Sequence, residues 1–435
     1  MAVPRAMVPM PTYVTVFENE VCSVFRIFFA TNKEKFIPFD SNYRKVSTML
    51  RHLQIIAFLL LSTLFTFGEK PKVFTPAAAQ FKQYLPLING KKVALVVNHT
   101  SLVGTKHLLD TLVAQGVQVM KVFGPEHGFR GKADAGDHVE NETDPATGVA
   151  VVSLYGKHNK PTPEDLKGVE AVIYDIQDIG VRFYTYSSTL HLVMEACAEN
   201  KVPLLVLDRA NPHANEVDGP VLDRKFSSFV GLNPIPLLYG CTSGELAKMI
   251  NGEGWLKNAV KCDLTVVSVP NYKRKQAVHI AIAPSPNLPN DQSIALYPSI
   301  CLFEPTVVSV ARGTDFPFQA IGTPKKKIGD FEFTPVPKPG AMDPVMKNQL
   351  CYGYDLRNVN AQKMGFSLKY LVEFFQQIDL KDKFFTSPSF FDKLAGTDQL
   401  RMQLINGLSE SEIRKSWSTD LASYRQIRKK YLIYP

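Results

Sequence analysis

From about residue 90 onward, short apolar runs rich in β-branched residues alternate with segments whose apolar residues recur at helical spacing. This alternation is typical of parallel strands joined by crossover helices, and it restricts the first half of the chain to an α/β fold. Each expected strand is almost continuously apolar, as a strand covered on both faces should be. The expected strands are Val93–Val97, Val117–Phe123, Val149–Leu154, Ala171–Ile176 and Pro203–Leu207.

Helix start signals lie between and after these runs. Thr242 and Glu245 have the spacing of a capping box, which predicts a helix as far as Gly252. Thr162, which is followed by a proline and two acids, predicts the start of another helix, because proline suits the first helical position. The remaining expected helix starts are Thr105 and Ser187 or Ser188.

The length of 435 residues is sufficient for two domains of ordinary size. The regular alternation fades after Tyr297, where a mixed segment leads to a charged, helical C-terminus. We therefore expect an α/β architecture in which a Rossmann-like, mostly parallel sheet with flanking helices occupies residues 80–295. A smaller α+β domain, residues 296–435, is expected to complete a cleft.

The N-terminus carries a second kind of signal. Residues 49–67 begin with a short basic stretch and continue as an apolar run, which is the pattern of a secretory signal peptide. We expect residues 49–79 to be signal peptide and linker, translation to start at Met49, and residues 1–48 to be a non-native or disordered extension. The mature protein is then extracytoplasmic, periplasmic or secreted, with no stable membrane span. An uncleaved membrane anchor is the alternative.

Charge and cysteine content exclude several classes of protein. The net charge is +8, but the basic residues are scattered and form no stripe of the nucleic-acid-binding type, so we expect no nucleic-acid partner. The presumed mature chain has an odd number of cysteines and no CxxC pair, so no disulfide framework is implied. No P-loop and no GxGxxG motif occurs, which argues against phosphate or dinucleotide binding, and we expect no cofactor.

The loop Gly124–Gly131 places reactive side chains directly behind an expected strand. Within it, Glu126 is the candidate for proton transfer. Its apolar neighbours Phe123 and Phe129 are expected to desolvate the carboxyl group and raise its pKa toward neutrality. The structural alternative is a glutamate that accepts backbone N–H bonds or pairs with Arg130.

Polar side chains also follow the other expected strands. Because the carboxyl ends of parallel strands meet at one edge of a sheet, we expect Glu126 to share a cavity there with Asp175 and Arg182. Asp175 and Asp178 each have two interpretations, as a second catalytic carboxylate or as a cap within the loop. The candidates contributed by the remaining strand ends are Asn98, Asp208 and Arg209.

His127 has two interpretations as well. It can bind a metal together with His138, Asp134 or Asp137, or it can orient its neighbours as a neutral imidazole. No HxH or HExxH spacing supports a metal site, so we expect none.

Candidates for substrate binding come from three residue types. A guanidinium group binds a carboxylate through two parallel hydrogen bonds, and tyrosine rings stack on sugar faces. Proline-rich segments around residues 284–289 and 312–318 form rigid loops that can close a cleft. Asn287 lies in the first of these loops. The arginine and tyrosine candidates are Arg130, Arg182, Arg209, Arg312, Tyr184 and Tyr186.

Five motifs in order, GPEHGFRG, YDIQDIGVRFYTY, LDRANP, TSGELA and PSPNLP, resemble the exo-β-N-acetylmuramidase family (NamZ), formerly a domain of unknown function. The resemblance extends from about Lys92 to the C-terminus. It implies a two-domain hydrolase that releases N-acetylmuramic acid from the non-reducing end of peptidoglycan fragments, so the expected partners are muropeptides or disaccharides.

The family's proposed catalytic glutamate corresponds to Glu126, which we expect to act as general acid. For His127, Asp175, Asp178 and Arg182 only membership of the motifs carries over. Our hypothesis is that Arg182 or Arg209 binds the lactyl carboxylate of the sugar. Two alternatives stay open: an envelope protein that binds muropeptides without cleaving them, and a metal-dependent hydrolase that uses His127.

Overall fold

The computed structural model describes residues 71–126, 128, 129 and 142–435. The expected signal segment and the extension in front of it therefore lie outside the described residues. Within the described ranges, no helix combines the length and the apolar character needed to cross a membrane.

The first half of the described chain is built on a seven-stranded sheet with the order β11-β8-β7-β1-β4-β6-β5. Six strands run parallel, and only the edge strand β5 pairs antiparallel, with β6. The order from β6 to β11 is that of a Rossmann sheet, with the reversal of strand order between β1 and β7. The strands are β1 (Lys92–Val97), β4 (Gln118–Gly124), β5 (Glu142–Thr143), β6 (Ala150–Ser153), β7 (Ala171–Asp175), β8 (Leu204–Leu207) and β11 (Leu264–Val267).

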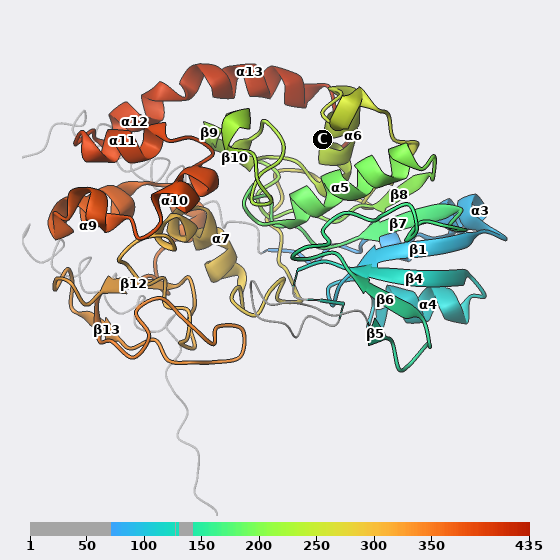
Figure 1. Ribbon diagram of the computed structural model, residues 1–435, viewed down its shortest axis with the longest axis horizontal. Coiled ribbons are helices and arrows are strands. Elements are labelled where there is room, and N and C mark those ends of the chain that lie inside the picture. The colour runs from blue at the N-terminus through green and yellow to red at the C-terminus, as the bar shows by residue number, and fades with distance from the viewer. Residues whose placement is uncertain (1–70, 127, 130–141) are drawn as a thin grey trace, which may run out of the picture. The chain divides into compact units, whose positions relative to one another are not determined.

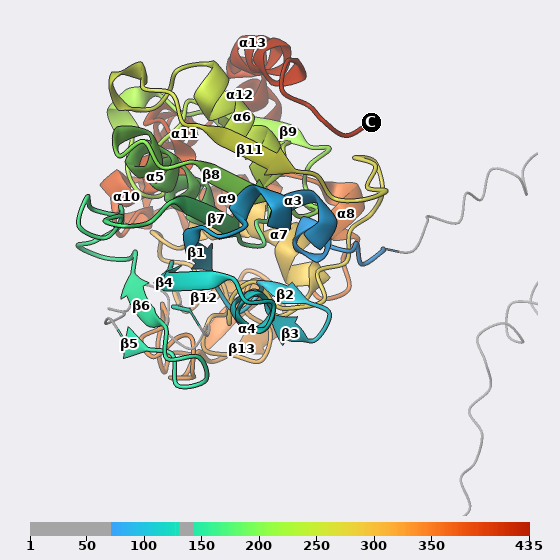
Figure 2. The ribbon, with the colours of Figure 1, turned by 90° about the vertical axis from the view of Figure 1, so that its right-hand side faces the viewer.

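Helices cover both faces of this sheet, which explains why the strands read as continuous apolar runs. In β1, Val93, Leu95 and Val97 belong to the core beneath α3 (Phe81–Ile88) and α4 (Leu108–Ala114). The alternate residues Ala94 and Val96 belong to the larger core that includes α5 (Tyr186–Glu199) and α6 (Ser243–Gly252). Figure 2 shows α5 on one side of the sheet and α3 and α4 on the other.

The five expected strands are present with ends shifted by one residue, and β11 is an additional strand. The capping box of Thr242 and Glu245 opens α6 as predicted. Two helix predictions need correction. Thr105 lies in the hairpin of β2 (Leu102–Val103) and β3 (Lys106–His107), so the next helix starts at Leu108. The stretch after Thr162 forms turns, because the side chain of Asp165 binds back to Thr162.

The segment between β8 and α6 contains a two-stranded antiparallel sheet of β9 (Val217–Val221) and β10 (Pro236–Tyr239). Short 3-10 helices accompany the first half of the described chain. They are η1 (Ala77–Ala79), η2 (Arg224–Phe226) and η3 (Lys257–Ala259).

The second half has a three-stranded antiparallel sheet with the order β12-β14-β13, and helices lie above it in the view of Figure 1. Together with the parallel sheet, it confirms the predicted fold class. Its elements are α7 (Asp291–Ile300), η4 (Cys301–Phe303), β12 (Ala320–Thr323), β13 (Phe331–Phe333), β14 (Cys351–Asp355), α8 (Ala361–Met364), α9 (Lys369–Ile378), η5 (Lys381–Phe384), α10 (Pro388–Ala395), α11 (Gln399–Ile405), α12 (Glu410–Ser416) and α13 (Ser418–Lys429).

The end of the chain returns to the first half. Figure 1 shows α13 running back so that the C-terminus lies beside α6. The Tyr434 hydroxyl donates to Asp208 over 2.6 Å, and Arg428 donates to the carbonyl of Gly240 over 2.6 Å. These contacts attach the C-terminal segment to the carboxyl ends of β8 and β10.

Candidate active site

A cavity of about 380 Å³ lies between loops of the parallel sheet and segments of the second half of the chain. This volume falls within the roughly 300–1,000 Å³ that small-molecule sites occupy. Glu126, Tyr155 and Thr185 line it from the first half, and Glu304, Arg312 and Phe318 line it from the second. We call it the Glu126 cavity.

Glycines set the position of Glu126. At Gly124, the last residue of β4, a Cβ atom would approach the backbone nitrogen of Phe129 to 3.0 Å, so the loop folds back closely over the strand end. The N–H of Gly128 donates to the carbonyl of Pro125 over 2.9 Å, and Gly128 has a φ of +75°. Glycine adopts that backbone conformation without strain. The turn holds Glu126, half-buried, in the cavity wall.

Two hydroxyl groups hold the Glu126 carboxylate. Tyr155 donates to Oε1 over 2.9 Å, and Thr185 donates to Oε2 over 2.6 Å. Thr185 occupies the N-cap position of α5, but its side chain makes no capping bond to that helix. A hydroxyl donates to a carboxylate and can also accept from a carboxylic acid, so both partners suit either protonation state of Glu126.

The apolar neighbours expected around Glu126 are different ones in the structure. Phe129 is buried beneath the sheet and packs edge-on against His107, with ring centroids 4.8 Å apart. Phe123 is fully buried in the core. The aromatic residues that line the cavity with Glu126 include Tyr155, Tyr184 and Phe229.

Of the two tyrosines expected to stack on a sugar, Tyr184 lines the cavity and Tyr186 does not. Tyr184 lines the cavity and donates its hydroxyl to the carbonyl of Pro284 over 2.8 Å. Tyr186 lies behind it, 1% exposed, and its hydroxyl lies 3.5 Å from the carbonyl oxygen of Glu126. Asn98, also buried, donates to the Tyr186 hydroxyl over 2.9 Å. Asn98 and Tyr186 therefore support the Glu126 loop from behind the cavity wall.

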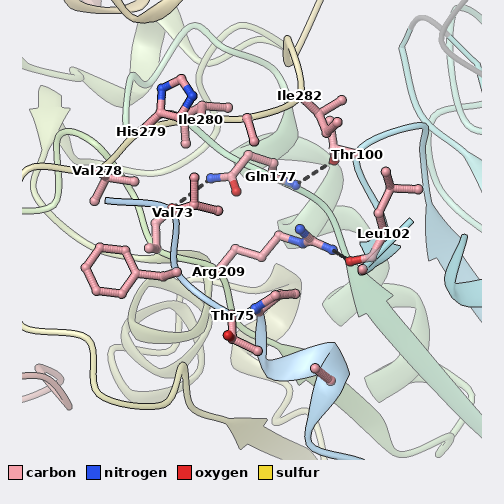
Figure 3. A pocket seen from close by; sticks show the side chains of 16 residues that line it. Val73, Thr75, Thr100, Leu102, Gln177, Arg209, Val278, His279, Ile280 and Ile282 are labelled. Carbon is pink, nitrogen blue, oxygen red and sulfur yellow. Dashed lines mark hydrogen bonds between the residues drawn. The ribbon is translucent and has the colours of Figure 1, made fainter. Parts of the chain in front are cut away.

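Asp175 and Arg209 form an ion pair away from the lining of the Glu126 cavity. Arg209 donates to both carboxylate oxygens of Asp175, over 2.5 and 2.9 Å, and Asp175 is fully buried. Arg209 lines a second cavity of about 390 Å³ with Thr100 and Gln177 (Figure 3). This geometry corrects the expectation of one shared cavity, because Asp175 does not line the Glu126 cavity and Arg209 is occupied by its ion pair.

Asp178 and Asp208 are buried anchors, which corrects their expected places in the site. Asp178 accepts from the Tyr239 hydroxyl over 2.6 Å and from the N–H groups of Ile179 and Gly180. Asp208 accepts from the Thr242 hydroxyl and the N–H of Gly244, at the start of α6, and from Tyr434. Both carboxylates therefore bind donors of the protein itself, and neither lines the Glu126 cavity.

Arg182 is a structural residue, which corrects the hypothesis that it binds substrate. Its side chain is fully buried and donates to three carbonyl oxygens, those of Pro220, Ile235 and Leu394, at 2.8 to 2.9 Å. Burial lowers the pKa of its guanidinium group to about 9. Arg182 joins the β9–β10 region to α10 and does not line the Glu126 cavity.

Two of the remaining candidates line the Glu126 cavity. Asn287 donates to the carbonyl of Gly340 over 2.7 Å, and Arg312 donates through Nε to Glu304 over 2.5 Å.

His127 and Arg130 lie outside the described residues, as do His138, Asp134 and Asp137. Among the residues that the structure does describe, no group of three or more His, Cys, Asp or Glu side chains is arranged to hold a metal ion.

Sequence reasoning missed Tyr155, Thr185 and Glu304. A signal existed for the first two: Tyr155 directly follows an expected strand, and Thr185 lies within the YDIQDIGVRFYTY motif. Glu304 follows the short helix η4 in the second half of the chain. No strand end or motif in the sequence indicates it.

The buried carboxyl of Asp178 predicts a pH dependence of stability. Burial raises its pKa to about 6, although the hydrogen bonds from Tyr239, Gly180 and Ile179 oppose this. The resulting stabilisation is fully present below about pH 4 and is lost as the pH rises through about 6. We expect Asp178 to contribute a decrease of roughly 3 kcal/mol in the free energy of unfolding across this range. Urea unfolding between pH 4 and 7 measures it.

Asp178→Asn is the control, because asparagine does not titrate. Its stability should fall less steeply with pH than that of the parent, whereas an equal slope would show that Asp178 has no part in the effect. Asp208, whose pKa is also raised to about 6 by burial, accounts for the slope expected to remain.

Comparison with known proteins agrees with this architecture. Residues 93–292 match the family model of the N-terminal domain of the exo-β-N-acetylmuramidase NamZ, and residues 295–434 match that of its C-terminal domain. The peptidoglycan β-N-acetylmuramidase NamZ of Bacillus subtilis is 40% identical over 393 residues, covering 84% of this chain and 92% of the relative.

Two crystal structures of DUF1343 family proteins from Bacteroides fragilis are similar in fold. One has a TM-score of 0.77 and 43% identity, and covers 83% of this chain and 99% of its own. The other has a TM-score of 0.74 and 30% identity, with coverages of 84% and 100%. The family models, the similar sequence and the two similar structures extend over both halves of the described chain, and the chain belongs to the exo-β-N-acetylmuramidase NamZ family.

Proposed function

We propose that this protein is an exo-acting glycoside hydrolase that releases N-acetylmuramic acid from the non-reducing end of peptidoglycan fragments. The observation that carries the proposal is the Glu126 carboxylate in the wall of a sugar-sized cavity, held by Tyr155 and Thr185. Membership of the NamZ family supports the same substrate class.

In the proposed reaction, Glu126 protonates the glycosidic oxygen as the bond to the anomeric carbon breaks. The proton leaves the carboxyl group, and the resulting carboxylate is stabilised by the two hydroxyl donors already in place. Because these donors are fixed before the reaction, little reorganisation accompanies the proton transfer.

Hydrolysis also needs a group that assists attack at the anomeric carbon. Asp175 and Asp178 do not line the cavity, so we do not assign them this role. Among the described lining residues, Glu304 is the other carboxylate. The acetamido group of the substrate is a further nucleophile that can act without a protein carboxylate.

The experiment is incubation of purified protein with a disaccharide of N-acetylmuramic acid linked β-1,4 to N-acetylglucosamine, with and without a chelator. We expect both monosaccharides in equal amounts and no effect of the chelator. Tight binding without product would instead indicate a muropeptide-binding envelope protein. Activity that is lost with chelator and restored by metal would indicate a metal-dependent hydrolase that uses His127.

We also propose that the protein is exported and acts outside the cytoplasm. The support is the basic start and apolar run of residues 49–67, together with a substrate class found in the cell envelope. Cell fractionation and N-terminal sequencing of the mature protein test this. A cytoplasmic protein that retains residues 49–67 would contradict it.

A further inference from the structure

Arg312 is the one cation among the described residues that line the Glu126 cavity. Its Nε donates to Oε1 of Glu304 over 2.5 Å, and its guanidinium carbon lies 4.9 Å from the centroid of the Phe318 ring. Glu304 in turn accepts from the thiol of Cys301 through Oε2. Because one edge and one face of the guanidinium are fixed, the group has a defined orientation in the cavity wall.

The terminal nitrogens of Arg312 make no hydrogen bond to any residue that the structure describes. The side chain is 19% exposed and lines the cavity. Arg182 and Arg209 differ in this respect, because both terminal nitrogens of Arg182 donate to backbone carbonyls and Nη2 of Arg209 donates to Asp175. Arg312 therefore combines a charge, a fixed orientation and free donors at the cavity.

From this geometry we infer that Arg312 is the specificity-determining residue, and that its terminal nitrogens bind the lactyl carboxylate of N-acetylmuramic acid. The inference rests on the proposed function. The lactyl ether with its carboxylate is what distinguishes this sugar from N-acetylglucosamine. A guanidinium group is suited to it because two parallel N–H donors match the two carboxylate oxygens.

The charges of the cavity support this role. An anionic sugar that enters a cavity with Glu126 and Glu304 meets two carboxyl groups, and like charges repel strongly where little water is present. The positive charge of Arg312 offsets the negative charge of Glu304. Burial lowers the pKa of Arg312, but the neighbouring Glu304 outweighs burial and raises it above its ordinary value, so the guanidinium stays charged. Glu304 is thus a positioning residue for Arg312.

The test compares two muramides that carry the same fluorogenic leaving group, one with a free lactyl carboxylate and one with a neutral lactyl amide. The parent enzyme should prefer the carboxylate. Arg312→Met should lose about 30-fold or more in kcat/KM on the carboxylate substrate, because it removes one partner of a buried charge pair. Its rate on the amide should change little, so the preference disappears. Arg312→Lys, which keeps the charge without the two-donor geometry, should recover part of it.

Two further variants separate specificity from folding. Arg312→Met combined with Glu304→Gln leaves no unpaired carboxylate, and in binding, which does not depend on turnover, it should show the same loss of preference for the acid over the amide. Arg357→Met is the matched control, because Arg357 pairs with Asp355 over 2.7 Å and stacks on Phe316 at 4.8 Å but does not line the cavity. This control should keep the parent's preference.

Binding separates failure of this inference from failure of the proposed function. Calorimetry with free N-acetylmuramic acid and its lactyl amide should show tighter binding of the acid to the parent, and equal binding of both to Arg312→Met. A preference that survives in Arg312→Met, in kcat/KM and in binding, overturns the inference while hydrolysis stands. Absence of hydrolysis with the binding preference intact overturns the proposed function alone.

Discussion

Glu126→Gln is expected to slow the release of N-acetylmuramic acid from its disaccharide with N-acetylglucosamine by roughly 10²–10⁴-fold, the usual contribution of a general acid. The glutamine side chain keeps the size and one acceptor oxygen of glutamate but has no proton to give to the departing oxygen. Product release is measured by chromatography under conditions of saturating substrate.

Stability is the control for this variant. Glu126 is half-buried, and among the residues that the structure describes two hydroxyl groups bind its carboxylate, so the thermal midpoint of Glu126→Gln should stay within a few degrees of the parent. Unchanged turnover would remove Glu126 from the mechanism. A loss of turnover that accompanies a large drop in the thermal midpoint would show a structural residue instead.

Arg182→Met is expected to have the largest effect on stability. It removes the donors of three backbone carbonyls while the side chain at this position stays fully buried. The carbonyl of Ile235 keeps the N–H of Leu222 as a donor, so the expected loss comes from the carbonyls of Pro220 and Leu394. Each unsatisfied buried acceptor costs roughly 1–3 kcal/mol, so we expect the free energy of unfolding to fall by about 3 kcal/mol. Chemical denaturation with urea measures this change.

The specificity of the same variant discriminates between the two roles of Arg182. In the folded fraction, the preference for the lactyl carboxylate over the lactyl amide should equal that of the parent, because Arg182 does not line the cavity. Unaltered stability combined with loss of this preference would restore Arg182 as a substrate ligand.

The sheet could be predicted because its signal is local. Strands such as β1 and β7 are covered on both faces, so their apolar runs stand out without knowledge of their partners. The strand β11 was missed because its residues are partly exposed and its apolar run is short. The helix predicted after Thr162 is absent because its signal is ambiguous. Threonine and aspartate side chains that cap a helix also stabilise an isolated turn.

The site was predictable only in part. Glu126 could be located because a glycine-bracketed loop follows a buried strand. A residue at a strand end is expected at the carboxyl edge of the sheet, but the sequence does not show in which direction its side chain points. Asp175 and Arg209 lie at that edge, yet they pair with each other near a different cavity. The wall formed by Glu304 and Arg312 comes from the second half of the chain, and only tertiary packing brings it to Glu126.

Proton donation by Glu126 is tested most directly by the dependence of the rate on the leaving group. A set of N-acetylmuramides whose phenol leaving groups increase in acidity is hydrolysed by the parent and by Glu126→Gln, and kcat is compared across the set. The variant should approach the parent rate as the phenol becomes acidic enough to depart without a proton. An equal loss of rate for every leaving group would contradict general acid catalysis by Glu126.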